Sequence, residues 1–264
     1  MNKMKTIVIK EWAEVFKNKI VLFTVAFLPL IFLALPIVTF WAMNSFSDET
    51  AASVNMGKME AFVGNVCVGL SEKACLDLYM LNLYTLLFMM LPVIIPVTIA
   101  AYSIVGEKTS RSLEPLLATP ITTGELLLAK MFAACMPAVV VTWAAFIIYA
   151  ILMWLMVDLA VFKLAMAPMW LMAIFIVGPL MSLMAVGAAV LISSRVSDPR
   201  AAEQMSAFVI LPVMLLLMGQ SMGFILVDAR TILLLGMVVL VIDVILIGMS
   251  VKLFQREKIL TQWK

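Results

Sequence analysis

Long apolar runs alternate with polar segments along the chain, and six of the runs are long enough to cross a membrane. An α-helix rises ~1.5 Å per residue, so about 20 apolar residues cross the hydrocarbon core of a bilayer. The predicted spans cover residues 20–43, 79–105, 131–157, 169–192, 206–227 and 232–253. Pro29 and Pro36 lie inside the first span, where we expect kinks rather than a break. The pattern predicts an all-α membrane protein with one domain of six transmembrane helices.

Residues 1–19 are basic and carry apolar residues at helical spacing. Ile9, Trp12 and Phe16 share one face of the predicted helix. An aromatic and apolar face beside several lysines is typical of an amphipathic helix that lies in the membrane interface. We therefore expect residues 1–19 to lie on the membrane surface ahead of the first span.

The polar segment 44–78, between the first two spans, is predicted to be an external loop. It contains two cysteines, Cys67 and Cys75, with seven residues between them. In an oxidising compartment these two residues would be able to form a disulfide. The sequence fits two free thiols equally well.

The composition agrees with a membrane location and argues against metal and catalytic sites. Hydrophobic residues make up 65% of the chain, charged residues make up 13%, and the mean hydropathy is +1.14. A soluble domain has about 45–50% apolar and about 25% charged residues. The chain has no His, the usual general base and commonest metal ligand, and its three Cys are too scattered for a zinc site. We expect no metal site, no catalytic centre and no nucleic-acid partner.

Positive charges divide unevenly between the two sides of the predicted topology. The side that carries both chain termini has 14 of the 18 Lys and Arg residues, and the other side has 4. Cytoplasmic loops of membrane proteins carry the excess of Lys and Arg, so both termini are predicted to lie in the cytoplasm. The expected location is the cell membrane, that is, a plasma or inner membrane.

The segment 106–130, between the second and third spans, has a pattern of helix, break and helix. Leu113, Leu116 and Leu117 fall on one face of a first short helix. Pro120 ends that helix or bars it from continuing. A short amphipathic helix just outside a membrane suits a docking surface for a soluble partner. The same pattern also fits a solvated turn between two membrane helices.

Two further helix starts carry capping signals. The second helix of this segment begins at one of the threonines at 122–123, with Glu125 in its first turn. Further along, Ser197 or Asp198 caps a helix that has Pro199 at its first position. Both helices are predicted to lead from the cytoplasmic side into a membrane span.

Four short blocks follow one another in the segment: Gly106-Glu107-Lys108, Ser112-Leu113-Glu114-Pro115-Leu116-Leu117, Pro120 and Gly124-Glu125-Leu126. This order resembles the cytoplasmic segment of the ABC-2 family of transporter permeases. The Ser-rich turn and Ala-rich helix start at 193–205 are similar to the same family. Six spans with both ends inside are also the ABC-2 arrangement, so the resemblance covers nearly the whole chain. Pro115 departs from the family pattern. Because proline fits only the first turn of a helix, we expect the coupling helix to begin near Glu114.

The resemblance implies a separate ATPase subunit of the ATP-binding-cassette type, which packs against residues 106–130 and drives them. It implies that ATP and Mg bind to that subunit and that this chain holds no cofactor. The phosphate-loop pattern GxxxxGK[ST] is not met here, because Glu107 separates Gly106 from the following lysine. The residues expected to couple to the ATPase are Glu107, Arg111, Leu113, Glu114, Leu116, Leu117 and Glu125.

Polar residues in the last two spans are candidates for a translocation path, namely Asp243, Gln220 and Ser221. A charge at the centre of a spanning helix costs about 2.5–3.5 kcal/mol, so Asp243 is expected to face the bundle interior or a water-filled path, or to be protonated. It would contact a cation or substrate, or else form a hydrogen bond with a Ser or Thr of a neighbouring span. The resemblance implies a re-entrant turn near the outer face after or within the fifth span, which Gln220 and Ser221 would line; the alternative is that they cap a helix end.

The pattern and the resemblance together predict the permease subunit of an ATP-binding-cassette exporter. We expect it to pair with a second permease, as a homodimer or with a similar chain. An ion-coupled secondary transporter is one alternative, for which several intramembrane ionisable residues and inverted repeats are expected. A membrane subunit that transmits force without moving a substrate is another. Nothing in the sequence selects a substrate.

Overall fold

The computed structural model describes residues 3–45, 67, 69–109, 122–194, 196, 198–222, 224 and 228–253. These residues are almost entirely helical, and none of them belongs to a strand. The helical stretches that are long and apolar enough to cross a membrane are Val21–Ser45, Glu72–Ser103, Gly124–Met156, Pro168–Ser193, Arg200–Gln220 and Ala229–Lys252. The predicted all-α fold with six spans is therefore confirmed for the described part of the chain.

The helices follow one another in a simple order. The first half of the chain contains α1 (Lys3–Lys17), α2 (Lys19–Ser45), α4 (Glu72–Phe88), α5 (Leu91–Thr109) and α7 (Thr123–Met156). The second half contains α8 (Leu159–Ala165), α9 (Pro168–Met172), the π-helix η3 (Ala173–Val177), α10 (Gly178–Ser193), α11 (Pro199–Ser206), the 3-10 helix η4 (Ala207–Ile210), α12 (Leu211–Ser221) and α13 (Ala229–Leu253).

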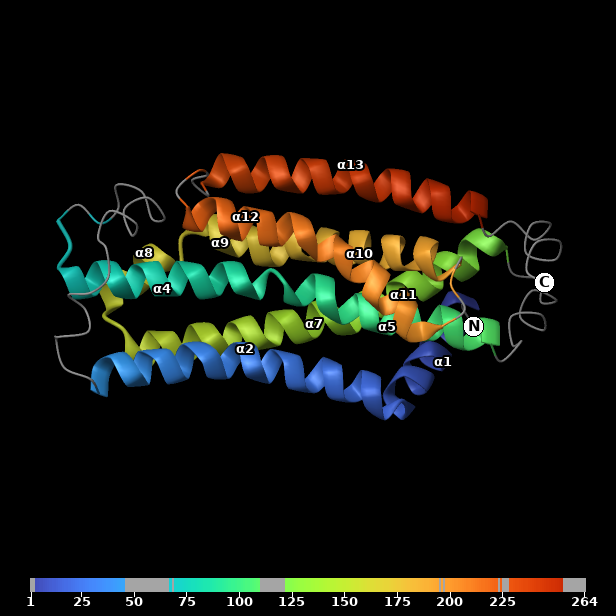
Figure 1. The fold of residues 1–264 in the computed structure, drawn as a ribbon, viewed down its shortest axis with the longest axis horizontal. Coiled ribbons are helices and arrows are strands. Elements are labelled where there is room, and N and C mark those ends of the chain that lie inside the picture. Colours follow the sequence, from blue (N-terminus) through green and yellow to red (C-terminus); the bar gives the residue numbers. More distant parts are fainter. Residues whose placement is uncertain are drawn as a thin grey trace.

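These helices form an elongated bundle whose long axis follows the spans (Figure 1). We call one end the α1 end; it holds α1, the end of α5, the start of α7 and the end of α13 (Figure 1). The end of α2, the start of α4 and α8 lie at the opposite end, the α8 end. The second span is central, because 83% of its most apolar window is buried, against 28% for α2 and 22% for α13. The helices α2 and α13 therefore lie on the outside of the bundle.

The second span consists of two helices rather than one. Met89 and Met90 separate α4 from α5. Pro92 accounts for this break, because it lacks the N–H that would bond to the Phe88 carbonyl, and its ring fits only the first turn of a new helix. In contrast, α2 continues through both of its internal prolines, as predicted.

The start of α4 differs from the predicted start of the second span. The helix begins at Glu72, inside the segment 44–78 that we predicted to be a loop, and not at Tyr79. Ser71 explains this start, because its hydroxyl accepts a hydrogen bond from the Ala74 N–H and so caps the first turn. The hydropathy pattern locates the membrane-spanning part of a helix and misses a polar extension of this kind.

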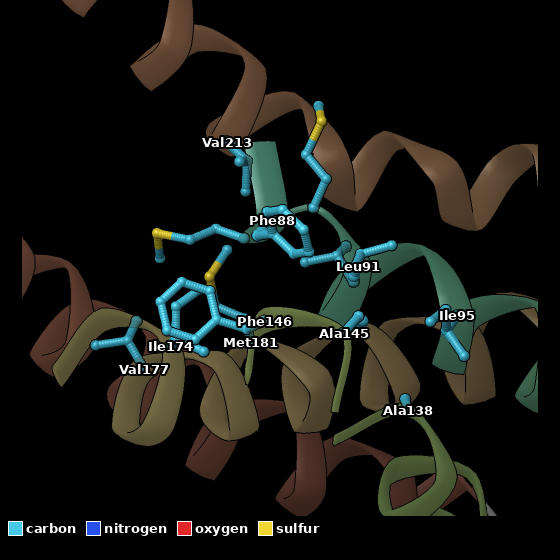
Figure 2. Packing of buried hydrophobic residues seen from close by; sticks show 14 of the residues in the cluster. Phe88, Leu91, Ile95, Ala138, Ala145, Phe146, Ile174, Val177, Met181 and Val213 are labelled. Carbon is cyan, nitrogen blue, oxygen red and sulfur yellow. The ribbon is translucent and has the colours of Figure 1, made fainter. Parts of the chain in front are cut away.

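Large apolar side chains from four helices meet in the middle of the bundle (Figure 2). Phe88 of α4, Leu91 of α5, Phe146 of α7 and Met181 of α10 are each at most 2% exposed. The rings of Phe88 and Phe146 pack edge to face, with centroids 6.1 Å apart. In a membrane, close packing of this kind holds helices together, since lipid tails are as apolar as the side chains.

Two glycines bring α13 close to α10 and η3. A Cβ added at Gly187 would lie 3.1 Å from the Leu246 Cβ, and one added at Gly236 would lie 3.2 Å from a methyl group of Val177. Small residues at helix crossings let the backbones approach each other in this way. The contact turns the face of α13 that carries Asp243 toward the rest of the bundle.

Candidate functional site

The structure describes the two flanks of the predicted coupling segment, and both lie at the α1 end (Figure 1). Arg111, Leu113, Glu114, Leu116 and Leu117 lie outside the described residues. Glu107 belongs to the last turns of α5, but its side chain is also outside the description. The flanks are α5, which ends at Thr109, and α7, which begins at Thr123. Both approach the same end of the bundle (Figure 1).

The Glu125 side chain helps to cap the first turn of its own helix, α7. The Thr122 hydroxyl accepts a hydrogen bond from the Glu125 N–H at 3.3 Å, and the Glu125 carboxylate accepts one from the Thr122 N–H at 3.0 Å. This is a capping box, which satisfies free N–H groups at a helix start. The predicted helix start is confirmed, and it is Thr122 that caps the helix. Glu125 is exposed, so its outer surface stays accessible to a partner.

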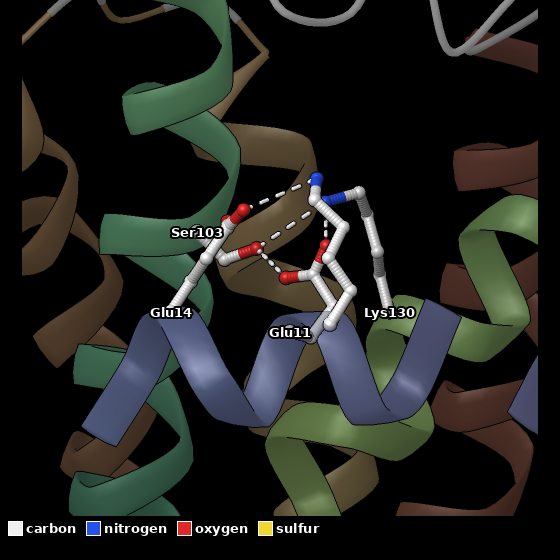
Figure 3. A network of polar contacts seen from close by, with 5 residues as sticks. Glu11, Glu14, Ser103 and Lys130 are labelled. Carbon is white, nitrogen blue, oxygen red and sulfur yellow. Dashed lines mark hydrogen bonds and ion pairs between the residues drawn. The ribbon is translucent and has the colours of Figure 1, made fainter. Parts of the chain in front are cut away.

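A buried polar network joins α1 to both flanks of the segment (Figure 3). The Lys130 ammonium donates to the Glu11 carboxylate at 2.6 Å and to the Ser103 hydroxyl at 3.3 Å. The Ser103 hydroxyl donates to the other oxygen of Glu11 at 2.6 Å. Glu11 comes from α1, Ser103 from α5 and Lys130 from α7. The network therefore joins three helices that are distant from one another in the sequence.

Burial makes this network energetically important. Glu11 is 2% exposed and Lys130 is 8% exposed. Burial alone would raise the pKa of Glu11, but the Lys130 charge and the hydrogen bonds from Lys130 and Ser103 outweigh it, so the pKa lies below its ordinary value. A cavity of about 10 Å³ adjoins the three side chains, which is close to the smallest space that holds a water molecule.

Glu11 is the functional candidate that the sequence analysis missed. The buried positions of α1 are Ile7, Glu11 and Val15, whereas Ile9 and Phe16, predicted to share the apolar face, are 55% and 50% exposed. The sequence does contain a signal for the burial of Glu11. Ile7, Glu11 and Val15 are spaced four residues apart and so share one helix face. An acidic residue between two apolar ones on such a face indicates a buried partner. That α1 lies in a membrane interface remains a prediction.

Trp12 adds a second connection from α1 to α7. Its indole N–H donates to the Ala133 carbonyl at 3.0 Å. Within an α-helix this carbonyl would accept from residue 137, but Pro137 has no N–H to donate. Trp12 therefore satisfies a carbonyl that proline leaves without its helical donor, and it fixes the register between α1 and α7.

Asp243 is the acidic residue that we predicted to face the interior of the bundle. It is 3% exposed, and neither carboxylate oxygen has a hydrogen-bond partner among the described residues. The alternative of a hydrogen bond to a neighbouring Ser or Thr therefore does not appear in the described part of the structure.

Gln220 and Ser221 lie at the end of α12. Gln220 is 2% exposed, and the Ser221 side chain is outside the description. The Met222 N–H donates to the Met218 backbone carbonyl at 2.9 Å, which closes the last turn of α12. The choice between a path-lining role and a role at the helix end stays a prediction for both residues.

Cys67 and Cys75 are joined by a disulfide, with their Cα atoms 5.3 Å apart. The bond connects the residues ahead of α4 to its first turn, at the α8 end (Figure 1). Cys135 is a free thiol. Within the described ranges, no group of three His, Cys, Asp or Glu side chains is arranged to hold a metal ion.

The chain resembles one known family over most of its length. The profile of the family described as "ABC-2 family transporter protein" matches residues 5–235. No curated protein matches the chain. The matched region begins within α1, contains Glu11, Ser103, Lys130 and the predicted coupling segment, and ends within α13. Asp243 lies just beyond it.

Proposed function

The chain belongs to the ABC-2 family of transporter proteins, and from this membership we propose that it is the permease of an exporter driven by a separate ATPase subunit. The observation that supports the proposal is the family match, which includes both flanks of the segment 106–130. The family implies a permease in the membrane and an ATP-binding-cassette partner outside it. ATP and Mg would bind to that partner.

The α1 end would face the cytoplasm and carry the ATPase. In the topology predicted from the sequence, 14 of the 18 Lys and Arg residues belong to the side that carries both termini, which is the distribution expected for cytoplasmic loops. The ATPase would dock on the segment 106–130 through the predicted coupling residues, with Glu125 accessible beside the start of α7. Closure of the ATPase subunits would push this segment, tilt α5 and α7, and open the path to the opposite side.

A second copy of the chain would complete the transporter. Six spans enclose little space, and their centre is filled by large apolar side chains. The helices α2, α12 and α13 leave most of their surface uncovered, with 28%, 18% and 22% of the most apolar window of their spans buried. Such faces are suited to contact lipid and a partner permease. A path between two copies is therefore the simplest arrangement.

Asp243 would contribute the charged contact on the translocation path, together with Gln220 and Ser221. Asp243→Asn keeps the shape of the side chain and removes its charge. We expect the complex to assemble at the wild-type level and to lose export. The measurement compares the compounds that accumulate in cells lacking the gene with those in cells complemented by the wild type or the variant. Complementation equal to the wild type at equal expression would contradict a role in transport.

Glu107→Ala tests the predicted coupling contact. The carboxylate would pair with a cation on the ATPase, and an exposed pair of this kind contributes only ~0–1 kcal/mol. We therefore expect the ATPase subunit to remain bound, with export lost while ATP hydrolysis persists. Co-purification and ATP hydrolysis measured on the same preparation check both parts. Loss of the ATPase from the complex would make Glu107 a structural anchor instead.

An ion-coupled transporter remains the second candidate, because Asp243 is a buried carboxylate without a partner among the described residues. An intramembrane carboxylate of this kind is a common component of proton and cation pathways. The two functions differ in whether an ATPase subunit is part of the complex. Export that continues without ATP hydrolysis in vesicles would favour the second.

A further inference from the structure

The helix α1 is attached to the start of α7 at successive turns. Ile7 packs against Leu126 and Ala129 in a small buried cluster. One turn later, the Lys130 ammonium donates to the Glu11 carboxylate, and the Trp12 indole N–H donates to the Ala133 carbonyl of α7. The contacts progress along both helices together, so α1 cannot slide along α7 without breaking an ion pair and a hydrogen bond.

The same network reaches the other flank of the coupling segment. Ser103 lies three residues before Gly106, the first residue of the coupling segment. Lys130 is the last residue of that segment. Both side chains bond to the single carboxylate of Glu11. Glu11 therefore connects α5, which precedes the segment, to the first turns of α7 at its end. A displacement of the segment would act on the Glu11 carboxylate through both Ser103 and Lys130.

On its other side, α1 connects directly to the first span. Only Asn18 separates α1 from α2, and the Leu22 N–H already bonds to the Asn18 carbonyl. The first span is held loosely in the bundle, since 28% of its most apolar window is buried against 83% for the second span. A helix with few buried contacts moves at lower free-energy cost than a central one.

We propose that α1 carries the movement of the coupling segment to the first span, with Glu11 as the positioning residue that connects them. The inference rests on the proposed function and extends it. When the ATPase displaces the start of α7, α1 follows because of the Glu11–Lys130 pair and the Trp12 bond, and α2 moves with it. Transport would then involve α2 as well as the two spans that flank the segment.

The test measures the position of α2 against α13, a span that packs mainly against α10. Spin labels are placed at the exposed positions Val38 of α2 and Val241 of α13, in a Cys135→Ala background. Labelled chains are diluted with unlabelled ones, so that each distance belongs to one copy. The complex is purified with its ATPase subunit and studied without nucleotide and after trapping with ATP, Mg²⁺ and vanadate.

We expect the wild type to show a shift in the distance between α2 and α13 on trapping. Glu11→Ala is expected to abolish this shift while the ATPase subunit stays bound and hydrolyses ATP. Trp12→Phe is a milder second variant that keeps the ring packing and loses the bond to Ala133, and we expect it to reduce the shift. Glu14→Ala is the matched control, because Glu14 lies on the same helix in an exposed pair with Lys10 and is expected to keep the full shift.

Each outcome decides the inference. A wild-type shift in Glu11→Ala or in Trp12→Phe would overturn it, since the movement would then reach α2 by another route. The absence of any shift in a wild-type complex that hydrolyses ATP would overturn it as well. A wild-type chain that purifies without an ATPase subunit would overturn the proposed function itself, so the two failures are distinguishable.

Discussion

Lys130→Met is expected to lower the free energy of unfolding by about 3–5 kcal/mol, because it leaves Glu11 buried without its counter-ion. Methionine keeps most of the apolar stem of lysine, so the loss comes from the charge rather than from packing. The Ser103 hydroxyl would still donate to the Glu11 carboxylate, but the hydrogen bond and the charge of Lys130 would be lost. For a chain of this size the expected fall in Tm is roughly 6–20 °C.

Thermal unfolding of the purified protein in one detergent measures this effect. Lys10→Met is the control, because Lys10 pairs with Glu14 at 3.4 Å on the surface, where an ion pair contributes about 0–1 kcal/mol. A double variant, Glu11→Leu with Lys130→Met, removes both buried charges and is expected to recover most of the lost stability. An equal Tm for Lys130→Met and Lys10→Met would contradict the importance of the network.

The Glu11 ion pair also predicts a loss of stability in acid. Burial opposes ionisation of Glu11, but Lys130 and Ser103 outweigh it and keep the pKa below the ordinary value of 4.5. A depressed pKa contributes stability that is fully present above pH 4.5 and is lost as the pH falls through the lower pKa of the folded state. The Tm advantage of the wild type over Lys130→Met is therefore expected to shrink below that pH.

Trp170→Ala is expected to have an effect of the same size, about 3–5 kcal/mol. The side chain is 0% exposed, and its indole N–H donates to the Asn82 side-chain oxygen inside the bundle. Truncation removes a large packed ring and leaves the Asn82 oxygen buried without that donor. Trp170→Phe separates the two effects, because it keeps a ring and loses the hydrogen bond, for which about 1–3 kcal/mol is expected.

The matched control for this prediction is Trp154→Ala. Trp154 is 54% exposed on the outside of α7, so its truncation removes little packing within the bundle. Expression level and Tm of the three variants, measured side by side, check the prediction. A Trp170→Ala variant as stable as Trp154→Ala would show that the described packing around α9 is not what stabilises the α8 end of the bundle.

The sequence predicts the features of this fold that depend on local chemistry. The six spans follow from the length of apolar runs, since each run crosses the bilayer by itself. The starts of α7 and α11 follow from Thr122 with Glu125 and from Asp198 ahead of a proline, because a capping side chain acts within its own first turn. The break in the second span at Met89 was not predicted, although the reason for it, Pro92, is visible in the sequence.

Features that depend on contacts between distant segments could not be predicted in the same way. Glu11 and Lys130 are 119 positions apart, and nothing local in either segment says that they meet. From the sequence, Lys130 was counted only among the positive charges of one side, and Glu11 was not considered. The position of Asp243 was predictable in part, because a charge in a span is expected to avoid lipid. The lack of a partner for its carboxylate among the described residues depends on how α7, α10 and α13 pack.

The most direct test of the proposed function is a purification of the tagged chain from its native membrane in a gentle detergent, with its partners identified by mass spectrometry. We predict a stoichiometric ATP-binding-cassette ATPase subunit, which is lost when residues 106–130 are replaced and retained when an exposed position such as Glu14 is changed. A complex that keeps its permease oligomer and contains no ATPase would contradict the proposed function. Asp243 would then be the first residue to study for ion coupling.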